Sequence, residues 1–181
     1  TGREAFRMLL RGEISGHLWN KLFRRSVVAK ASFTPARVHS DLIMVADALA
    51  NARRVAFTAP AVYYYLLRPN SLITAVSRRA DSLDSVDRAV RRGAKRLGLT
   101  ASDDYRYFRV RYIHLSGLKD AMNASYPPAE RASLISKRRR ALTLRDVFLL
   151  LRRRDLRRLA LSITAKTSVR AHRALLVLAE R

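Results

Sequence analysis

The chain has 181 residues, enough for one domain with a substantial core, and its 49% hydrophobic content excludes an intrinsically disordered composition. The 37 Lys and Arg residues against 14 Asp and Glu residues give a formal charge of +23, so we expect an anionic partner: nucleic acid, phospholipid or a phosphorylated ligand. Cysteine is absent, which excludes disulfides and thiolate metal sites.

The first part of the chain begins with two helical patterns separated by a loop. Apolar side chains at helical spacing predict helices over residues 1–11 and 41–52, and Ser40 or Asp41 is placed to cap the second one. Residues 19–29 have a mixed pattern, which favours a short helix. The chain starts with Thr inside a helical pattern, so we expect it to be part of a longer protein.

Extended segments and then further helices follow along the chain. Residues 54–57 and 62–67 are rich in β-forming side chains and predict two short strands. Helical spacing returns over residues 82–97 and 104–123. Pro128 suits the start of a new helix, and the remainder of the chain is a helical pattern rich in Leu and Arg.

These elements predict an α+β fold that is mostly helical, with short strands in the first half and a helical C-terminal region. We expect two regions, residues 1–76 and residues 77–181, because the mixed pattern gives way to a basic helical pattern near residue 71. No apolar run reaches the length of a membrane span, and no signal peptide opens the chain.

Four stretches of the first region share an order and spacing with a known family. They are WNKLFRRSVV at 19–28, Phe33, SDLIMVADALANARRVAF at 40–57 and YYYLLRPNSLIT at 63–74. Together they resemble the acceptor-side half of a bacterial family 2 glycosyltransferase of the GT-A fold, a group that builds capsular and other surface polysaccharides. The resemblance implies an inverting, hexosyltransferase-like enzyme that moves sugar from a nucleotide-sugar to a surface-polysaccharide or lipid-linked acceptor.

The same resemblance implies a catalytic role for Asp41. In such enzymes an aspartate takes the proton of the acceptor hydroxyl as that oxygen attacks the anomeric carbon, and a base of this kind contributes about 10²–10⁴-fold. A position at a helix start favours the ionised carboxylate. The family has a Glu just before this Asp, where this chain has Ser40. The residues alone favour a different reading, in which Asp41 caps its helix, and one carboxylate could serve as both.

Further substrate-binding residues follow from the family pattern. It places Trp19, Asn20 and Lys21 on the acceptor side, where an indole can stack on a sugar and the two polar groups can bind hydroxyls or phosphate. The alternative is a Trp19 in the core and a solvated Lys21. Arg68 and Ser71 match the later part of the pattern, and Arg68 could hold the donor diphosphate, although it also fits a surface turn.

Features of a nucleotide-sugar-binding half are missing from this sequence. No two Asp residues lie two positions apart, no Gly-rich phosphate loop is present, and the four His residues are scattered. We therefore expect no metal or cofactor site in this chain. For the full-length enzyme, the resemblance implies a nucleotide-sugar and a divalent metal, Mg²⁺ or Mn²⁺, and we expect this chain alone to be inactive.

The C-terminal region mixes basic and apolar residues at helical spacing, which is typical of an interfacial helix. Each Lys or Arg near an anionic leaflet contributes about 1 kcal/mol. We therefore expect a cytoplasmic protein, peripheral at the inner face of the cell membrane. The predicted membrane-binding residues are Arg138, Arg139, Arg140, Arg152, Arg153 and Arg154.

Three other interpretations of the basic region remain. The chain could be a basic nucleic-acid-binding helical protein, although the region lacks interleaved aromatic residues for base stacking, which makes nucleic acid an unlikely partner. It could have a solvated charged face only, as in an arginine-rich organism. It could also be a scaffold-like remnant that binds membrane without catalysis.

Overall fold

The computed structural model describes residues 1–31, 34, 36, 38–58, 63, 64, 66, 78–123 and 126–179. Within these ranges the regular secondary structure is helical and no strand is present. The predicted α+β class, with the short strands of a GT-A fold, is therefore wrong. Residues 54–57 form irregular backbone, and the second predicted strand lies largely outside the described residues. A strand needs a pairing partner, which β-forming composition alone does not supply.

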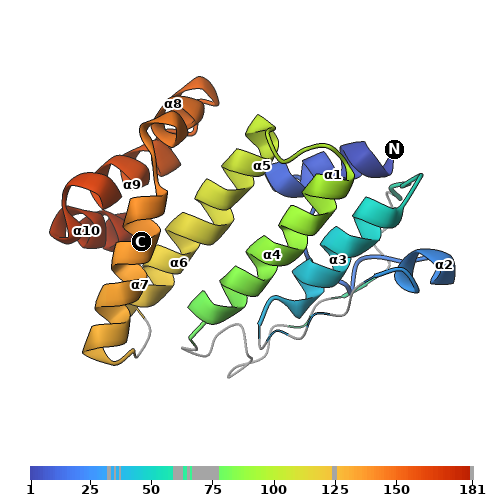
Figure 1. Ribbon diagram of the computed structural model, residues 1–181, viewed down its shortest axis with the longest axis horizontal. Helices are drawn as coiled ribbons and strands as arrows, with labels where there is room; N and C mark the ends of the chain where they lie inside the picture. The colour runs from blue at the N-terminus through green and yellow to red at the C-terminus, as the bar shows by residue number, and fades with distance from the viewer. Residues whose placement is uncertain are drawn as a thin grey trace. The chain divides into compact units, whose positions relative to one another are not determined.

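The chain divides into two compact units. The first contains Thr1–Ala75 and Asp81–Tyr105, and the second contains Val76–Ala80 and Arg106–Arg181. The sequence pattern placed the division at residue 76, but nearly all of α4 (Ala80–Arg96) clusters with the first unit. Figure 1 labels the helices in chain order.

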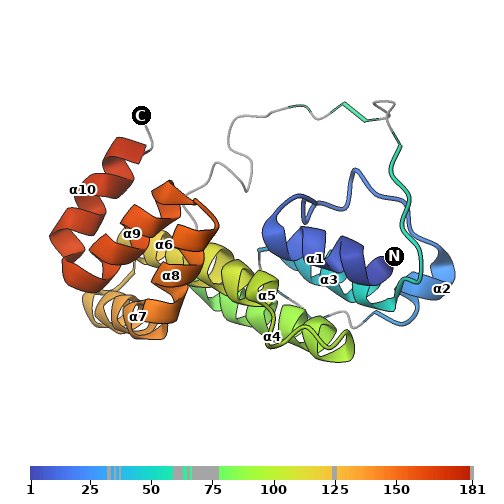
Figure 2. The ribbon, with the colours of Figure 1, turned by 90° about the horizontal axis from the view of Figure 1, so that it is seen from above.

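The first unit is built on α1 (Gly2–Arg11) and α3 (Ser40–Asn51), which lie side by side (Figure 2). Both predicted helices are confirmed. Thr1 caps α1 by accepting a hydrogen bond from the amide of Glu4. Phe6 of α1 is fully buried, and its ring lies so close to Gly93 of α4 that a Cβ built there would be 2.7 Å from the ring. The contact brings α4 against α1.

The predicted short helix over residues 19–29 is reduced to α2 (Arg25–Val28). The residues before it, 12–24, form a loop between α1 and α2 that carries the predicted residues Trp19, Asn20 and Lys21. Gly12 ends α1 in the left-handed conformation, with φ of 85°, which glycine adopts without a Cβ penalty.

The predicted helix over residues 104–123 is present, but it is not uniform. α5 (Asp103–Phe108) continues directly into η1 (Arg109–Leu115), a π-helical segment, and then into α6 (Ser116–Asn123). Seven residues of π-helix are unusual, since such segments are mostly single-turn bulges. The wider turn buries Val110, Ile113 and Leu115 of η1.

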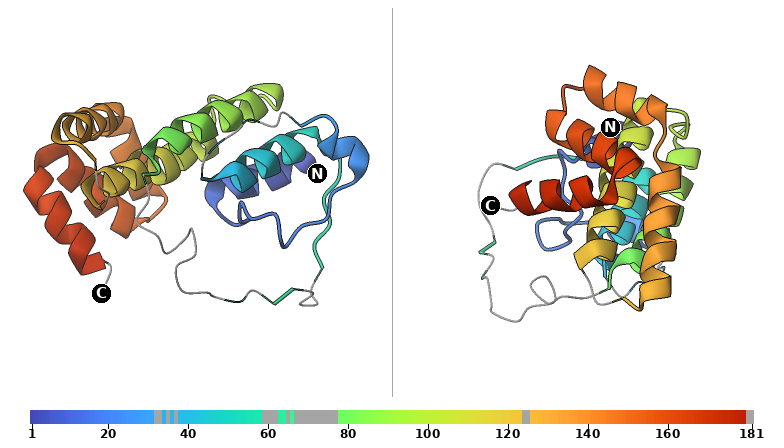
Figure 3. Two further views of the ribbon diagram at one scale, coloured as in Figure 1. Left: turned by 90° about the horizontal axis from the view of Figure 1, so that it is seen from below. Right: turned by 90° about the vertical axis from the view of Figure 1, so that its left-hand side faces the viewer.

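Four more helices complete the second unit (Figure 3). They are α7 (Pro128–Ala141), α8 (Leu144–Arg152), α9 (Leu156–Thr167) and α10 (Val169–Ala179). Pro128 begins α7 as predicted. Thr143 and Asp146 form a capping box at the start of α8, and Asp155 caps α9. The buried core of the unit contains Tyr107, Val110, Leu115, Leu118, Met122, Leu142, Leu149, Leu150, Leu161, Ala165 and Leu176.

Among the described residues, no helix combines the length and the apolar content that crossing a bilayer requires.

Candidate functional site

The loop between α1 and α2 lies against the first turn of α3, and Gly16 permits this approach. A Cβ on Gly16 would lie 2.7 Å from Cδ1 and 2.9 Å from Cβ of Leu42. Both distances are below van der Waals contact, and Leu42 is buried, so a larger residue would push the loop away. Gly16 therefore holds residues 17–21 beside the N-terminus of α3.

Asp41 is in the first turn of α3 and is half-buried. Its Oδ2 accepts a hydrogen bond from the Leu18 amide at 3.4 Å, and Oδ1 has no hydrogen bond among the described residues. His39, with φ of 67°, holds the N-cap position without a side-chain cap, so neither Ser40 nor Asp41 caps α3 as predicted. The carboxylate is tied to the loop and keeps one free oxygen.

Lys21 and Asn20 hold the loop together. The ammonium of Lys21 donates to the His17 carbonyl at 2.8 Å, to Asn20 Oδ1 at 2.7 Å and to Ser15 Oγ at 3.3 Å. Asn20 Nδ2 also donates to Ser15 Oγ, at 3.3 Å. Burial lowers the pKa of Lys21, and the nearby charge of Asp41 opposes this shift. These two residues thus shape the loop, and the three donors of the Lys21 ammonium are all used inside it.

Three rings form a continuous stack beside Asp41. The Trp19 ring centroid is 5.6 Å from that of His17 and 5.0 Å from that of Tyr63, with interplanar angles of 23° and 25°. Trp19 is 39% exposed and Tyr63 is 50% exposed, so the interpretation of Trp19 as a core residue is wrong. Stacking is a favourable arrangement for aromatic rings, and their faces provide flat carbon surface.

Sequence reasoning missed two members of this stack, His17 and Tyr63. His17 lies two positions from Trp19, a spacing that an extended loop can bring into contact. Tyr63 comes from beyond α3, so only the three-dimensional path of the chain brings it to the stack. The predicted residues Arg68 and Ser71, and Phe33 of the family pattern, lie outside the described residues.

The six predicted membrane-binding arginines have different environments. Arg140, Arg152 and Arg154 are exposed. Arg138 is only 2% exposed and donates to the Ala80 carbonyl at 3.3 Å, so its prediction as a membrane contact is wrong. Arg139 and Arg153 are half-buried, and the Arg153 guanidinium lies 4.8 Å above the Tyr107 ring.

An exposed apolar ridge accompanies the arginines on α8. Leu144, Phe148 and Leu151 repeat at i, i+4 and i+7, so they lie on one face of the helix, and all three are exposed. The opposite face, with Leu149 and Leu150, is buried in the core. Sequence reasoning noted the apolar residues of this segment but could not assign them to buried and exposed faces.

The described residues include no group of three or more His, Asp or Glu side chains that could hold a metal ion. Two carboxylates belong to or adjoin this loop: Glu13, which is paired with Arg11, and Asp41, which accepts from the Leu18 amide. A divalent metal generally needs several oxygen ligands, so these residues do not fit a metal.

No protein-family model, no curated protein and no solved structure matches this chain. The function is therefore inferred from the residues and their geometry.

Proposed function

We propose that the first unit binds a saccharide acceptor for an inverting sugar transfer, and that the second unit holds the protein at an anionic membrane surface. One observation carries the sugar proposal. Asp41 accepts a hydrogen bond from the amide of Leu18, the residue between His17 and Trp19 of the ring stack, and its Oδ1 has no hydrogen bond among the residues that the structure describes. Flat ring surfaces suit the apolar faces of sugars, and a carboxylate is the group needed to accept a hydroxyl proton.

The proposed reaction uses Asp41 as the general base. The acceptor hydroxyl gives its proton to Oδ1 of Asp41 while its oxygen forms a bond to the anomeric carbon of the donor. The bond from that carbon to the nucleoside diphosphate breaks, and the diphosphate leaves with the electron pair. The Leu18 amide donates to Oδ2, which holds the carboxylate beside the loop. The donor would be a nucleotide-sugar bound by residues other than those described.

Saccharide binding can be tested directly, because Trp19 is the only tryptophan of the chain and its fluorescence reports on the stack. We expect oligosaccharides of glucose, galactose or N-acetylglucosamine to change the emission in a saturable way. Tyr63→Ala should weaken binding by roughly tenfold, the equivalent of one stacking contact. Tyr64→Ala is the matched control, since Tyr64 is 88% exposed and its ring is not in the stack. Unchanged emission with every saccharide, or equal weakening by both variants, would overturn the proposal.

The role of Asp41 is tested by Asp41→Asn, which keeps an oxygen for the Leu18 amide but cannot take a proton. Sugar transfer is measured with the chain joined to a nucleotide-sugar-binding domain. We expect the rate to fall by about 10²–10⁴-fold while saccharide affinity stays within about twofold. Full turnover by the Asn variant would show that Asp41 is not the base. No transfer by the parent protein would instead support a scaffold without catalysis.

The membrane proposal is supported by α8, where the ridge of Leu144, Phe148 and Leu151 is exposed beside basic residues such as Arg152. Such a helix lies in the headgroup region with its apolar face inserted. The expected partner is a bilayer containing anionic lipid, at the inner face of the cell membrane.

Flotation with vesicles of phosphatidylcholine, with and without phosphatidylserine, tests this proposal. We expect binding only to the anionic vesicles and strong loss of binding in Phe148→Glu. The control is Phe57→Glu, because Phe57 is 66% exposed, close to the 68% of Phe148, but belongs to the first unit. Equal loss in both variants would contradict insertion by α8. A gel shift with duplex nucleic acid and indifference to vesicles would instead support the nucleic-acid-binding alternative.

A further inference from the structure

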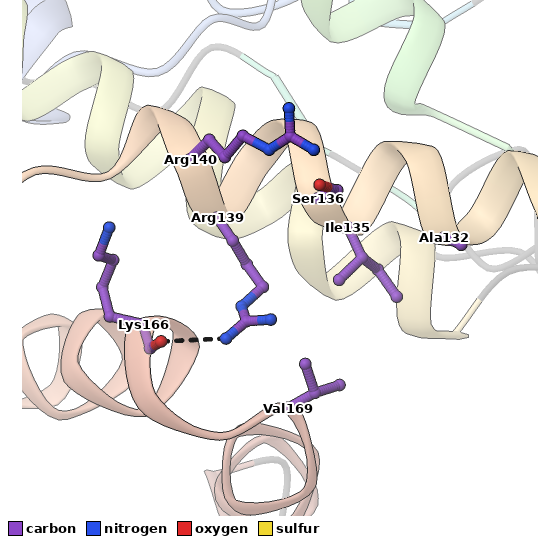
Figure 4. A pocket seen from close by; sticks show the side chains of 7 residues that line it. All are labelled: Ala132, Ile135, Ser136, Arg139, Arg140, Lys166 and Val169. Carbon is purple, nitrogen blue, oxygen red and sulfur yellow. Dashed lines mark hydrogen bonds between the residues drawn. The ribbon is translucent and has the colours of Figure 1, made fainter.

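An open groove lies within the second unit, between α7 and the junction of α9 with α10. Its volume is about 530 Å³, within the usual range for small-molecule sites. It is lined by Ala132, Ile135, Ser136, Arg139, Arg140, Lys166 and Val169. Figure 4 shows Ile135 of α7 and Val169 of α10 pointing toward each other from opposite walls, with the Arg139 side chain crossing from α7 to α9 beside them.

Arg139 is fixed in this groove by its own hydrogen bonds. Its Nε donates to the Ala165 carbonyl at 2.6 Å, and its Nη2 donates to the Lys166 carbonyl at 3.0 Å (Figure 4). These carbonyls belong to the last turn of α9, which lacks intrahelical donors and carries partial negative charge. The guanidinium is thus held in place while its positive charge is not matched by a carboxylate of the lining.

Arg140 and Lys166 add two exposed cationic groups. Neither side chain makes an ion pair or a hydrogen bond among the described residues, and the lining contains no Asp or Glu. Three positive charges with no counter-charge around one groove favour an anion with more than one negative charge, and planar guanidinium groups match phosphate oxygens well. Ser136 supplies a neutral hydroxyl donor.

The rest of the lining is apolar. Ala132, Ile135 and Val169 have no hydrogen-bonding side-chain groups, so they leave part of any ligand in a hydrophobic environment. Inorganic phosphate alone would leave this surface uncovered. A phosphate carrying a hydrocarbon chain would satisfy both ends of the groove.

We propose that this groove binds the phosphomonoester headgroup of a lipid, with the phosphate near Arg139, Arg140 and Lys166 and the start of the acyl chain against Ile135 and Val169. The inference does not rest on sugar transfer by the first unit. It would add a specific lipid site to the general attraction of α8 for anionic membranes.

Binding of lipid monomers tests the groove apart from membrane insertion. Dihexanoyl phosphatidic acid is titrated below its micelle concentration and followed by calorimetry and by NMR amide shifts, with dihexanoyl phosphatidylcholine and inorganic phosphate as comparison ligands. We expect saturable binding of the phosphatidic acid, roughly tenfold tighter than either comparison ligand, with the largest shifts in residues 132–140 and 165–169.

The charge-removing variant is Arg140→Gln with Lys166→Gln, since neither side chain supports the fold. It should weaken binding by roughly tenfold or more. Arg170→Gln with Arg173→Gln is the control, because it removes the same charge from exposed positions of α10 outside the groove. Equal weakening by the two double variants, equal affinity for inorganic phosphate, or absence of saturable binding would each overturn the proposal. The vesicle-flotation and saccharide-binding experiments change residues outside this groove, so their outcomes do not decide whether the groove binds lipid.

Discussion

Asp155 is a carboxylate of the second unit that accepts hydrogen bonds from a tyrosine and an arginine. Its Oδ2 accepts hydrogen bonds from the Tyr107 hydroxyl at 2.7 Å and from Arg158 Nη1 at 2.8 Å, and its Oδ1 accepts from the Arg158 amide at 3.2 Å. Burial alone would raise the pKa of Asp155, but the hydrogen bonds from Tyr107 and Arg158 outweigh it and the pKa is lowered. The carboxylate also faces the field of Arg111, whose pKa is lowered by burial and by the charge of Arg158.

We therefore expect Asp155→Ala to lower the free energy of unfolding by about 2–3 kcal/mol, because it removes a helix cap and leaves charged partners unmatched. Asp155→Asn keeps the capping oxygen and should lose less than the Ala variant. Urea unfolding followed by circular dichroism measures both. An Ala variant as stable as the parent would show that the cluster contributes nothing.

His172 is a buried histidine whose pKa should be visible in the stability of the protein. It is 1% exposed, its Nδ1 is 3.0 Å from Thr164 Oγ1, and burial, with a further contribution from the charge of Arg139, lowers its pKa below 6.5. The unfolded chain then binds a proton more readily than the folded chain. Stability is present above the unfolded pKa and is lost as the pH falls below it.

The free energy of unfolding should fall less steeply with decreasing pH in His172→Gln than in the parent. The difference in slope is at most about 1.4 kcal/mol per pH unit, the limit for one proton. The measurement is urea unfolding at a series of pH values between neutral and mildly acidic. The same slope in His172→Gln as in the parent would assign the pH dependence to other groups.

Some neighbours within the candidate site follow from the sequence, whereas the contacts of each side chain do not. The family pattern grouped Trp19, Lys21 and Asp41, and the structure places them in or beside one loop. The family pattern did not reveal that the Lys21 ammonium donates its hydrogen bonds to other residues of the loop. The prediction that Arg138 contacts membrane was wrong because it assumed that every residue of a basic run is exposed. Arg138 follows the apolar Leu134 by four residues, so both lie on one face of α7.

At the scale of elements, helices with a strong apolar repeat were predicted well and extended segments were not. α1, α3 and α4 follow from spacing, because a helix satisfies its backbone hydrogen bonds internally. Strands depend on a partner elsewhere in the chain, so residues 54–57 stay irregular despite their composition. The π-helical η1 was also missed, since apolar spacings of three and four fit an α-helix equally well.

Helix packing in the first unit depends on the close approach of Gly93 to Phe6. A Cβ at position 93 would lie 2.7 Å from Phe6 Cε2 and 3.3 Å from Ala50 Cβ, and the Phe6 ring is fully buried and cannot move aside easily. We expect Gly93→Val to destabilise the protein by about 1–3 kcal/mol through overpacking.

Arg91→Val provides the control for this substitution, since it places the same side chain at an exposed position of α4. Valine has a lower helix propensity than arginine but a higher one than glycine, so propensity lowers the stability of Arg91→Val only. A lower melting temperature of Gly93→Val in thermal unfolding would therefore report overpacking. Equal melting temperatures would mean that α1 and α4 adjust to the added methyl groups without loss.

At the scale of the whole molecule, the charge of +23 comes from 31 Arg and 6 Lys residues, so it does not fall with pH in the physiological range. Binding to anionic vesicles should therefore weaken steeply with salt, by roughly tenfold or more between low and physiological ionic strength, because ions screen exposed charges such as those of Arg140, Arg152 and Arg154. Flotation across a salt series measures this. Binding that ignores salt would show that apolar insertion dominates.

The close approach of Gly16 to Leu42 affects which substitutions the first unit can tolerate. Gly16 has no side chain with which to touch a sugar, yet it sets the distance between the loop and α3 through its clearance from Leu42. If the first unit transfers sugar as proposed, a selection for well-folded variants without transfer should therefore recover substitutions at Gly16 as well as at Asp41.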